Sequence, residues 1–127
     1  MNSLDTNVIL RFLLDDVPEQ TRKIKPIVTG SAAYVTDVVM TEAVFVLERV
    51  IGINRRDILR LIKAFLGLPN LIYNDYFLDQ VIDLYGGRSS LSFVDCYAAV
   101  EAKVYGNALV TFDKALLKHG GSRVKAP

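Results

Sequence analysis

Short apolar runs alternate with longer amphipathic stretches along this chain, and that alternation restricts its fold more than any other feature of the sequence. The short runs predict buried strands, and the longer stretches predict helices. No two-residue hairpin turn joins one strand to the next, so neighbouring strands are expected to be parallel. The predicted fold class is therefore α/β, with three layers: a central, mainly parallel sheet of four to five short strands between helices on both faces.

The predicted elements follow from this alternation and from the residues that begin and end helices. Strands are expected at Met1–Leu4, Ala32–Thr36, Leu71–Asn74 and Ala108–Thr111, with an edge strand at Arg123–Lys125. Helices are expected at Asn7–Leu14, Pro18–Val28, Val38–Ile51, Arg55–Leu66, Tyr76–Tyr85 and Ser92–Tyr105, with a short last helix from Phe112 or Asp113 to His119. Pro26 is expected to end or kink the second helix. A flexible loop is expected at Gly86–Ser90.

The totals of the sequence restrict the class of protein. The 127 residues, 51% of them apolar, are expected to form one domain, 1–127. Fifteen basic and fourteen acidic residues give a net charge of +1, which argues against a strongly basic nucleic-acid clamp and against an acidic tail. The single cysteine, Cys96, excludes an internal disulfide. No apolar run reaches the ~20 residues of a membrane span, and no leader precedes Asp5, so a cytoplasmic location without a membrane is expected.

Asp5 is the first candidate functional residue. It follows the first predicted strand directly and precedes the first predicted helix. Open α/β proteins place ligand-binding groups at the carboxyl ends of strands, where they face the crevice above the sheet. A helix N-cap formed by Asp5 or Thr6 would explain the same position equally well.

Glu42 is the most informative acid, because its neighbours one helical turn away are all apolar. Those neighbours are Val38, Val39, Phe45 and Val46, so Glu42 has no cation on its own helix and is expected to be partly buried. An isolated buried carboxylate is costly, and such groups are usually paired or bound to a metal. An arginine or a backbone group from elsewhere in the chain would satisfy Glu42 without a metal.

Asp95 lies three residues after Ser92, in the spacing of a capping box, which would give it a purely structural role. One turn further along the same helix, the small residues Ala98 and Ala99 would allow an ion or another group to approach it. Both interpretations are compatible with the sequence.

Asp113 lies just past a predicted strand, as Asp5 does, and Thr111 offers a hydroxyl two residues earlier. The alternative is again a helix N-cap. The remaining aspartates are interpreted as caps, turn residues or solvated charges, and spacing alone does not select four acids from the whole set: Asp15, Asp16, Asp37, Asp57, Asp75, Asp79 and Asp83.

Other catalytic chemistries find little support in the chain. The lone histidine, His119, lies at a predicted helix C-terminus, where its charged form is favourable. Cys96 is expected to be an inert core thiol, and no Ser-His-Asp arrangement, Cys/His metal spacing or Gly-rich phosphate loop is present. These observations favour an oxygen-rich site for a hard metal ion over a nucleophile activated by histidine.

Four segments of the chain, in this order, resemble the acidic motifs of PIN domains. They are Leu4-Asp5-Thr6-Asn7, Thr41-Glu42, Phe93-Val94-Asp95 with Ala98-Ala99, and Val110-Thr111-Phe112-Asp113. No single motif is specific, but all four occur in order and cover essentially the whole chain. The length and the position of the first acid resemble those of the small, single-domain VapC-type toxins of bacterial or archaeal toxin–antitoxin pairs.

The resemblance implies a PIN-like α/β/α fold and an endoribonuclease that depends on Mg²⁺ or Mn²⁺. Asp5, Glu42, Asp95 and Asp113 would be the catalytic, metal-binding acids. Residues that would orient the carboxylates and waters are Thr6, Asn7 and Thr111. It also implies an RNA substrate, a homodimer and a cognate antitoxin that inserts an arm into the active-site groove. Cations near the motifs in sequence are candidate phosphate contacts: Arg11, Arg49, Lys103, Lys114 and Lys118.

Two other functions compete with the ribonuclease. A PIN-like module could have kept the acids but act by binding an antitoxin or another copy of itself, through the apolar helices around Val44–Ile51 and Leu59–Leu66. A Mg²⁺-dependent phosphatase could be built around Asp5. It is less well supported, because Asn7 occupies the position of the second aspartate in an Asp-x-Asp phosphatase motif.

Overall fold

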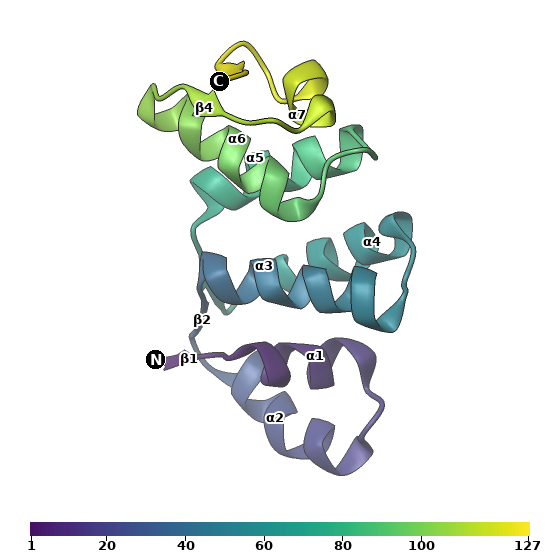
Figure 1. The fold of residues 1–127 in the computed structure, drawn as a ribbon. Helices are drawn as coiled ribbons and strands as arrows, with labels where there is room; N and C mark the ends of the chain where they lie inside the picture. The colour runs from purple at the N-terminus through teal and green to yellow at the C-terminus, as the bar shows by residue number, and fades with distance from the viewer. The chain divides into compact units, whose positions relative to one another are not determined.

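The computed structural model describes all residues from Met1 to Pro127 and confirms an α/β fold with short parallel strands (Figure 1). The chain divides into two compact units, Met1–Asn74 and Asp75–Pro127, which are described separately. The elements of the N-terminal unit are β1 (Asn2–Ser3), α1 (Thr6–Leu14), α2 (Pro18–Gly30), β2 (Ala33–Val35), α3 (Asp37–Phe45), the π-helical turn η1 (Val46–Ile51), α4 (Arg55–Leu66) and β3 (Leu71–Tyr73). Those of the C-terminal unit are α5 (Asp75–Gly87), α6 (Phe93–Tyr105), β4 (Leu109–Val110), α7 (Lys114–His119) and β5 (Val124–Lys125).

The N-terminal unit is built on a three-stranded parallel sheet in the order β1-β2-β3. Ala33 of β2 lies opposite Asn2 of β1 and Leu71 of β3. The Leu4 N–H extends the first pair by donating to the Tyr34 carbonyl oxygen at 2.9 Å. Because the strands are parallel, the helices α1 and α3 both begin at the same edge of the sheet, which is the edge where ligands bind in open α/β proteins.

Helices supply most of the core of this unit. α1 packs against both α2 and α3, and the rings of Phe12 and Phe65 lie 5.8 Å apart at an angle of 52°. α4 is amphipathic, with its apolar stripe inward and the cations Arg56, Arg60 and Lys63 exposed. The buried side chains of the unit include Ile9, Leu10, Val28, Met40, Ala43, Val44, Leu47, Ile58, Ile62 and Phe65. The strands are too short to form a core without this cover.

Two helices run further than their sequences predict. α2 continues through Pro26 to Gly30, so Pro26 does not end this helix. Pro26 is exposed, and water can solvate the carbonyl group that lacks its N–H partner. α5 includes Gly86 and Gly87, which were expected to lie in a loop, and the Arg88 N–H continues its hydrogen-bonding pattern to the Leu84 carbonyl oxygen at 3.0 Å.

The helix that begins at Asp37 ends before Gly52, as predicted, but its last part is a π-helical turn. The N–H groups of Gly52 and Ile53 both donate to the Leu47 carbonyl oxygen, at 3.1 and 2.9 Å. Gly52 has φ 84°, a left-handed conformation that favours glycine, and this closes the helix.

The C-terminal unit is dominated by the packing of α5 against α6. The rings of Tyr85 and Phe93 lie 5.3 Å apart at 71°, an edge-to-face arrangement. β4 and β5 form a two-stranded parallel sheet in which Leu109 lies opposite Val124. The expectation that the strand after α6 is buried is wrong for Val110, which is 52% exposed. The edge strand expected at Arg123–Lys125 is confirmed as β5.

None of the helices combines the length and the apolar character that crossing a bilayer requires. No polar or charged residue is fully buried in the structure.

Candidate active site

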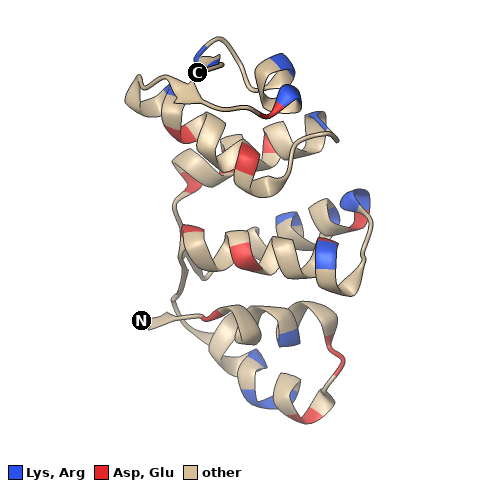
Figure 2. Ribbon diagram, in the orientation of Figure 1, with Lys and Arg blue, Asp and Glu red and all other residues tan.

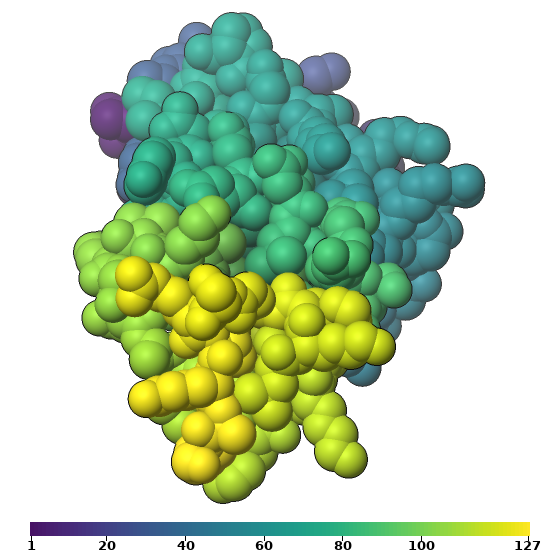
Figure 3. All heavy atoms as spheres, turned by 90° about the horizontal axis from the view of Figure 1, so that it is seen from above, coloured from purple at the N-terminus to yellow at the C-terminus, as the bar shows by residue number.

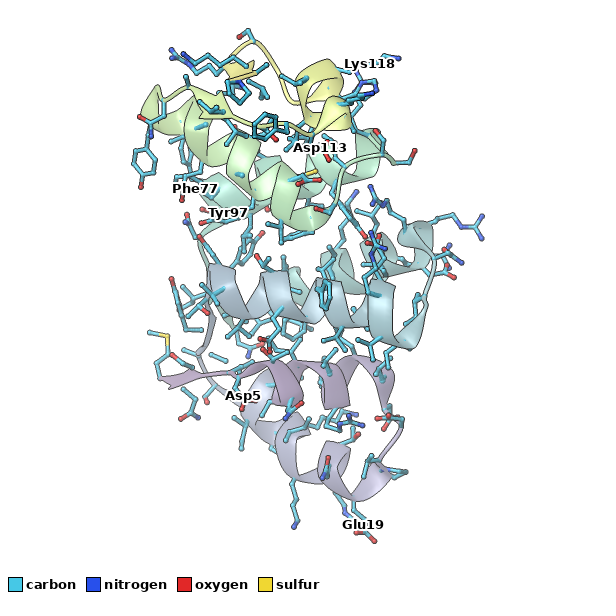
Figure 4. All side chains as sticks on the ribbon, in the orientation of Figure 1. Asp5, Glu19, Phe77, Tyr97, Asp113 and Lys118 are labelled. Atoms are coloured by element: carbon cyan, nitrogen blue, oxygen red, sulfur yellow. The ribbon has the colours of Figure 1, made fainter.

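Asp5 caps helix α1. Its Oδ1 accepts a hydrogen bond from the Val8 N–H at 2.9 Å, so the capping role that the sequence suggested is confirmed. Its other carboxylate oxygen makes no hydrogen bond, and the side chain is exposed at the start of the helix (Figure 4). A cap uses only one of the two oxygens, so Asp5 remains able to bind a ligand.

Glu42 lies on α3, five residues after Asp37 begins the helix. The expectation that Glu42 is partly buried is wrong, because its side chain is exposed and makes no hydrogen bond or ion pair. Its apolar neighbours Val38 and Phe45 are themselves 77% and 54% exposed. The side of α3 that faces the core consists of other residues, namely Met40, Ala43 and Val44.

The N-terminal unit brings Asp5 and Glu42 onto neighbouring helices. α1 and α3 follow the adjacent parallel strands β1 and β2, and the two helices pack against each other. Glu42 is about 8 Å along α3 from its first residue. The two acids therefore lie on helices that pack against each other, with Asp5 at the start of α1 and Glu42 more than one turn into α3.

The same edge carries polar residues whose function the sequence did not suggest. Asp37 lies two residues after β2, and of the two residues that the sequence allowed as the cap of α3, Asp37 and Thr36, the cap is Thr36. Asn74, which follows β3, donates through Nδ2 to Asp37 Oδ2 at 3.1 Å. The signal that could have identified this pair is the occurrence of a polar residue within two residues after the end of each strand of the sheet.

Asp95 and Ser92 form the capping box that their spacing predicts at the start of α6. Ser92 Oγ accepts from the Asp95 N–H, and Asp95 Oδ2 accepts from the Ser92 N–H, both at 3.1 Å. Asp95 is half-buried, and its Oδ1 makes no hydrogen bond. The bond from the Ser92 N–H to Oδ2 orients the Asp95 carboxylate.

Asp113 caps α7, where its Oδ1 accepts from the Leu116 N–H at 2.8 Å. The Asp113 N–H donates to Thr111 Oγ1 at 2.9 Å, so the threonine holds the backbone that carries the acid. Asp113 is exposed, and its Oδ2 makes no hydrogen bond. Figure 2 shows acidic residues at the starts of α1, α3, α5 and α7, and those of α1 and α7 are the caps Asp5 and Asp113.

Three residues were expected to orient the carboxylates, and only Thr111 makes a side-chain hydrogen bond to one of the four acids. Thr111 bonds to the backbone of Asp113, as described above, and not to its carboxylate. Thr6 and Asn7 follow Asp5 in the first turn of α1, and neither makes a side-chain hydrogen bond.

The expected phosphate contacts fall into two groups. Arg11 and Arg49 are paired: Arg11 Nη1 lies 2.6 Å from Asp16 Oδ1, and Arg49 Nε lies 3.8 Å from Glu48 Oε2. The three lysines are exposed and make no ion pair: Lys103, Lys114 and Lys118. Lys118 points away from α7 into solvent (Figure 4).

The four acids are therefore divided equally, with Asp5 and Glu42 in the N-terminal unit and Asp95 and Asp113 in the C-terminal unit. The structure contains no group of three or more histidine, cysteine, aspartate or glutamate side chains placed to bind one metal ion. Each aspartate keeps one uncommitted carboxylate oxygen, and carboxylate oxygens are the ligands that Mg²⁺ and Mn²⁺ prefer. The four-acid cluster stays a prediction.

Comparison with known proteins identifies the family. The family model for the PIN domain matches residues 3–121. The search of curated proteins finds no match. PIN domains are generally nucleases that use divalent metal ions and bind RNA. Because the match extends over nearly the whole chain and includes all four acids, the protein belongs to the PIN domain family.

Proposed function

We propose that this protein is a Mg²⁺- or Mn²⁺-dependent endoribonuclease that hydrolyses RNA phosphodiester bonds. Asp5, Glu42, Asp95 and Asp113 are the proposed metal-binding, catalytic acids. The observation that carries the proposal is the PIN domain match across residues 3–121. It is supported by the uncommitted carboxylate oxygen that each of the three aspartates keeps after capping its helix.

Helix caps give these acids a catalytic advantage. The N-cap bonds of Asp5 and Asp113, and the bond from the Ser92 N–H to Asp95 Oδ2, orient the three carboxylates before any ligand arrives. Preorganised charged groups lower the reorganisation that a reaction requires. When bound, a divalent ion lowers the pKa of a coordinated water and stabilises the negative charge of the phosphate. Thr111 would support this arrangement by holding the backbone of Asp113.

We further propose that the two units are parts of one domain, residues 1–127. The support is that a single family model runs through both units without a break. Each unit carries only two of the four acids, so neither alone would supply the ligand set that the proposed chemistry needs.

The proposed biological role is that of the toxin in a type II toxin–antitoxin pair, of the VapC type. The four motifs in their order along the chain support this role. Exposed apolar side chains on α3 and η1 would suit a homodimer partner or an antitoxin: Val38, Phe45, Val50 and Ile51. Analytical ultracentrifugation that finds only monomer at micromolar concentration would contradict the homodimer.

The test is RNA cleavage by the full chain with Mg²⁺ or Mn²⁺, with EDTA, and with the Asp5→Asn variant. We expect EDTA and Asp5→Asn each to abolish cleavage. Asparagine can still cap α1 through its side-chain oxygen, so the fold is preserved while the charge is lost. Glu19→Gln is the matched control, because Glu19 is an exposed acid at the start of α2 (Figure 4). Cleavage that survives both EDTA and Asp5→Asn would disprove the proposal.

The second candidate is a non-catalytic PIN-like module that works by binding a protein. The exposure of Val38 and Phe45 beside Glu42 favours it, because an apolar strip on a helix is typical of an interaction surface. Metal binding without any RNA cleavage, combined with stable self-association that Phe45→Ser abolishes, would favour this candidate over the ribonuclease.

A further inference from the structure

Two adjoining hollows open on the C-terminal unit. The first, of about 370 Å³, lies among α5, α6 and the end of α7. The second, of about 480 Å³, lies between α6 and the turn that follows α7. They share the wall residues Ala99, Lys103, Gly120 and Gly121. Figure 3 looks toward the C-terminal residues that form part of this region.

The second hollow is positively charged. Its lining contains Lys103, Arg123 and the Ser122 hydroxyl but no acidic residue. Lys103 is exposed and makes no ion pair, so its charge is available. Arg123 Nη1 donates to the Gly106 carbonyl oxygen at 2.8 Å, which holds the guanidinium in place and leaves its other N–H groups for a ligand. This combination suits a phosphate group.

The turn that forms the shared wall requires two glycines. A Cβ atom on Gly120 would lie 2.6 Å from the Leu116 carbonyl oxygen and 2.7 Å from Val124 Cγ2. Gly121 has φ 104°, which side chains other than glycine rarely adopt. The wall is therefore bare backbone of one defined shape, and the hollow exists before any ligand binds.

The first hollow has a different character. Its lining combines apolar side chains with polar and charged ones: Leu84, Ala99 and Val100, and Gln80, Asp83, Lys103 and His119. An apolar surface with a few hydrogen-bonding groups beside it suits a flat aromatic ring with polar edges, such as a nucleobase. The volume is within the range of roughly 300–1,000 Å³ that small-molecule sites occupy.

We propose that the two hollows together bind one nucleotide unit. Its phosphate contacts Lys103 and Arg123, and its base lies over Leu84, Ala99 and Val100. This nucleotide is either a free mononucleotide or one nucleotide of an RNA strand, because both present the same phosphate and base. The inference goes beyond the proposed ribonuclease activity, because binding here uses none of the four acids.

The position of Lys103 also suits an RNA strand. Asp95, Ala99 and Lys103 follow one another at one-turn spacing along α6. Lys103 is thus about 12 Å along the helix from Asp95. A strand held at the hollow could pass Asp95 within a few nucleotides.

The test measures binding by isothermal titration calorimetry, with the full chain in EDTA so that cleavage cannot interfere. The probes are adenosine and uridine monophosphates, inorganic phosphate and a six-nucleotide single-stranded RNA. We expect Lys103→Ala to weaken binding of the nucleotides or of the RNA by about tenfold. Lys103→Arg should retain binding. Lys23→Ala is the matched control, because Lys23 is also an exposed helical lysine without an ion pair.

Each outcome decides between the alternatives. Saturable binding of a mononucleotide that depends on Lys103 supports a free nucleotide as the ligand, and Lys103-dependent binding of RNA alone supports a strand. Inorganic phosphate that binds as tightly as a mononucleotide would overturn the role of the apolar hollow. Equal affinities of the wild type and Lys103→Ala, or no binding of any probe, would overturn the inference. Neither result would affect the proposed ribonuclease, which is tested by metal-dependent cleavage.

Discussion

The two units hold their acidic side chains in different ways. In the C-terminal unit, hydrogen bonds to backbone N–H groups orient both Asp95 and Asp113. In the N-terminal unit, Asp5 is oriented in the same way, but Glu42 has no hydrogen bond and is exposed. A glutamate without such bonds keeps its rotamer freedom, and ordering it costs up to about 2 kcal/mol. We infer that Glu42 is the acid whose position depends most on a bound ligand.

The largest expected effects come from breaking the core of each unit. Phe65→Ala in the N-terminal unit and Phe93→Ala in the C-terminal unit each remove a buried aromatic ring with a ring partner. Each should lower the free energy of unfolding by about 3–5 kcal/mol. In urea denaturation, one domain should show one transition that either substitution shifts. Two transitions, each sensitive to only one substitution, would contradict the single-domain proposal.

The next largest effect is a loss of RNA cleavage that leaves the free energy of unfolding unchanged. Glu42→Gln should lower RNA cleavage about a hundredfold, equivalent to about 2.7 kcal/mol of transition-state stabilisation. Its free energy of unfolding should stay unchanged, because the Glu42 side chain has no partner to lose. Single-turnover cleavage and thermal unfolding measure the two quantities. Cleavage at the wild-type rate would remove Glu42 from the proposed site.

A smaller effect is expected on stability when Asp95 or Glu42 is replaced by alanine, because only Asp95 takes part in helix capping. Asp95→Ala removes half of the capping box and should cost about 1 kcal/mol, or about 4 °C in Tm. Glu42→Ala, on an exposed position within α3, should leave Tm unchanged. Calorimetry of the two variants checks this difference. Equal Tm shifts in the two variants would show that the capping hydrogen bonds of Asp95 do not contribute to stability.

The smallest effect compares a paired cation with an unpaired one. Arg11→Ala breaks the partly exposed ion pair with Asp16 and should cost about 0.5 kcal/mol, an effect that high salt removes. Lys103→Ala should cost nothing in stability, since Lys103 makes no ion pair. Urea denaturation at low and at high salt measures both. A salt-independent loss in Arg11→Ala would point to packing by its aliphatic stem instead.

Local signals made the helix starts predictable. Asn54, Ser92 and Asp113 lie directly before the helices that they cap, and each accepts a hydrogen bond from a backbone N–H three residues later. Such bonds join residues within one helical turn, so the local sequence is enough to predict where these helices begin. The Gly86–Gly87 pair misled the prediction of where α5 ends, because a glycine costs only about 1 kcal/mol in a helix and tertiary packing can override that preference.

Long-range features could not be predicted in the same way. α3 is apolar around most of its circumference, so its sequence does not indicate whether Glu42 faces the core or the solvent. The two hollows join residues from Gln80 to Arg123, and their shape depends on the left-handed Gly121. Only the packing of α5, α6 and the last turn brings these residues together.

The shortness of β1 has a dynamic consequence. Asn2 and Ser3 are its only residues, and Leu4 makes the last hydrogen bond to β2 before Asp5. Opening of this strand breaks few backbone bonds, so it requires less free energy than global unfolding. The amide of Leu4 should therefore exchange with deuterium faster than those of Ile9 and Leu10 in the buried part of α1. Slowing of that exchange by Mg²⁺ or Mn²⁺ would give a spectroscopic signal of metal bound at Asp5, independent of any cleavage.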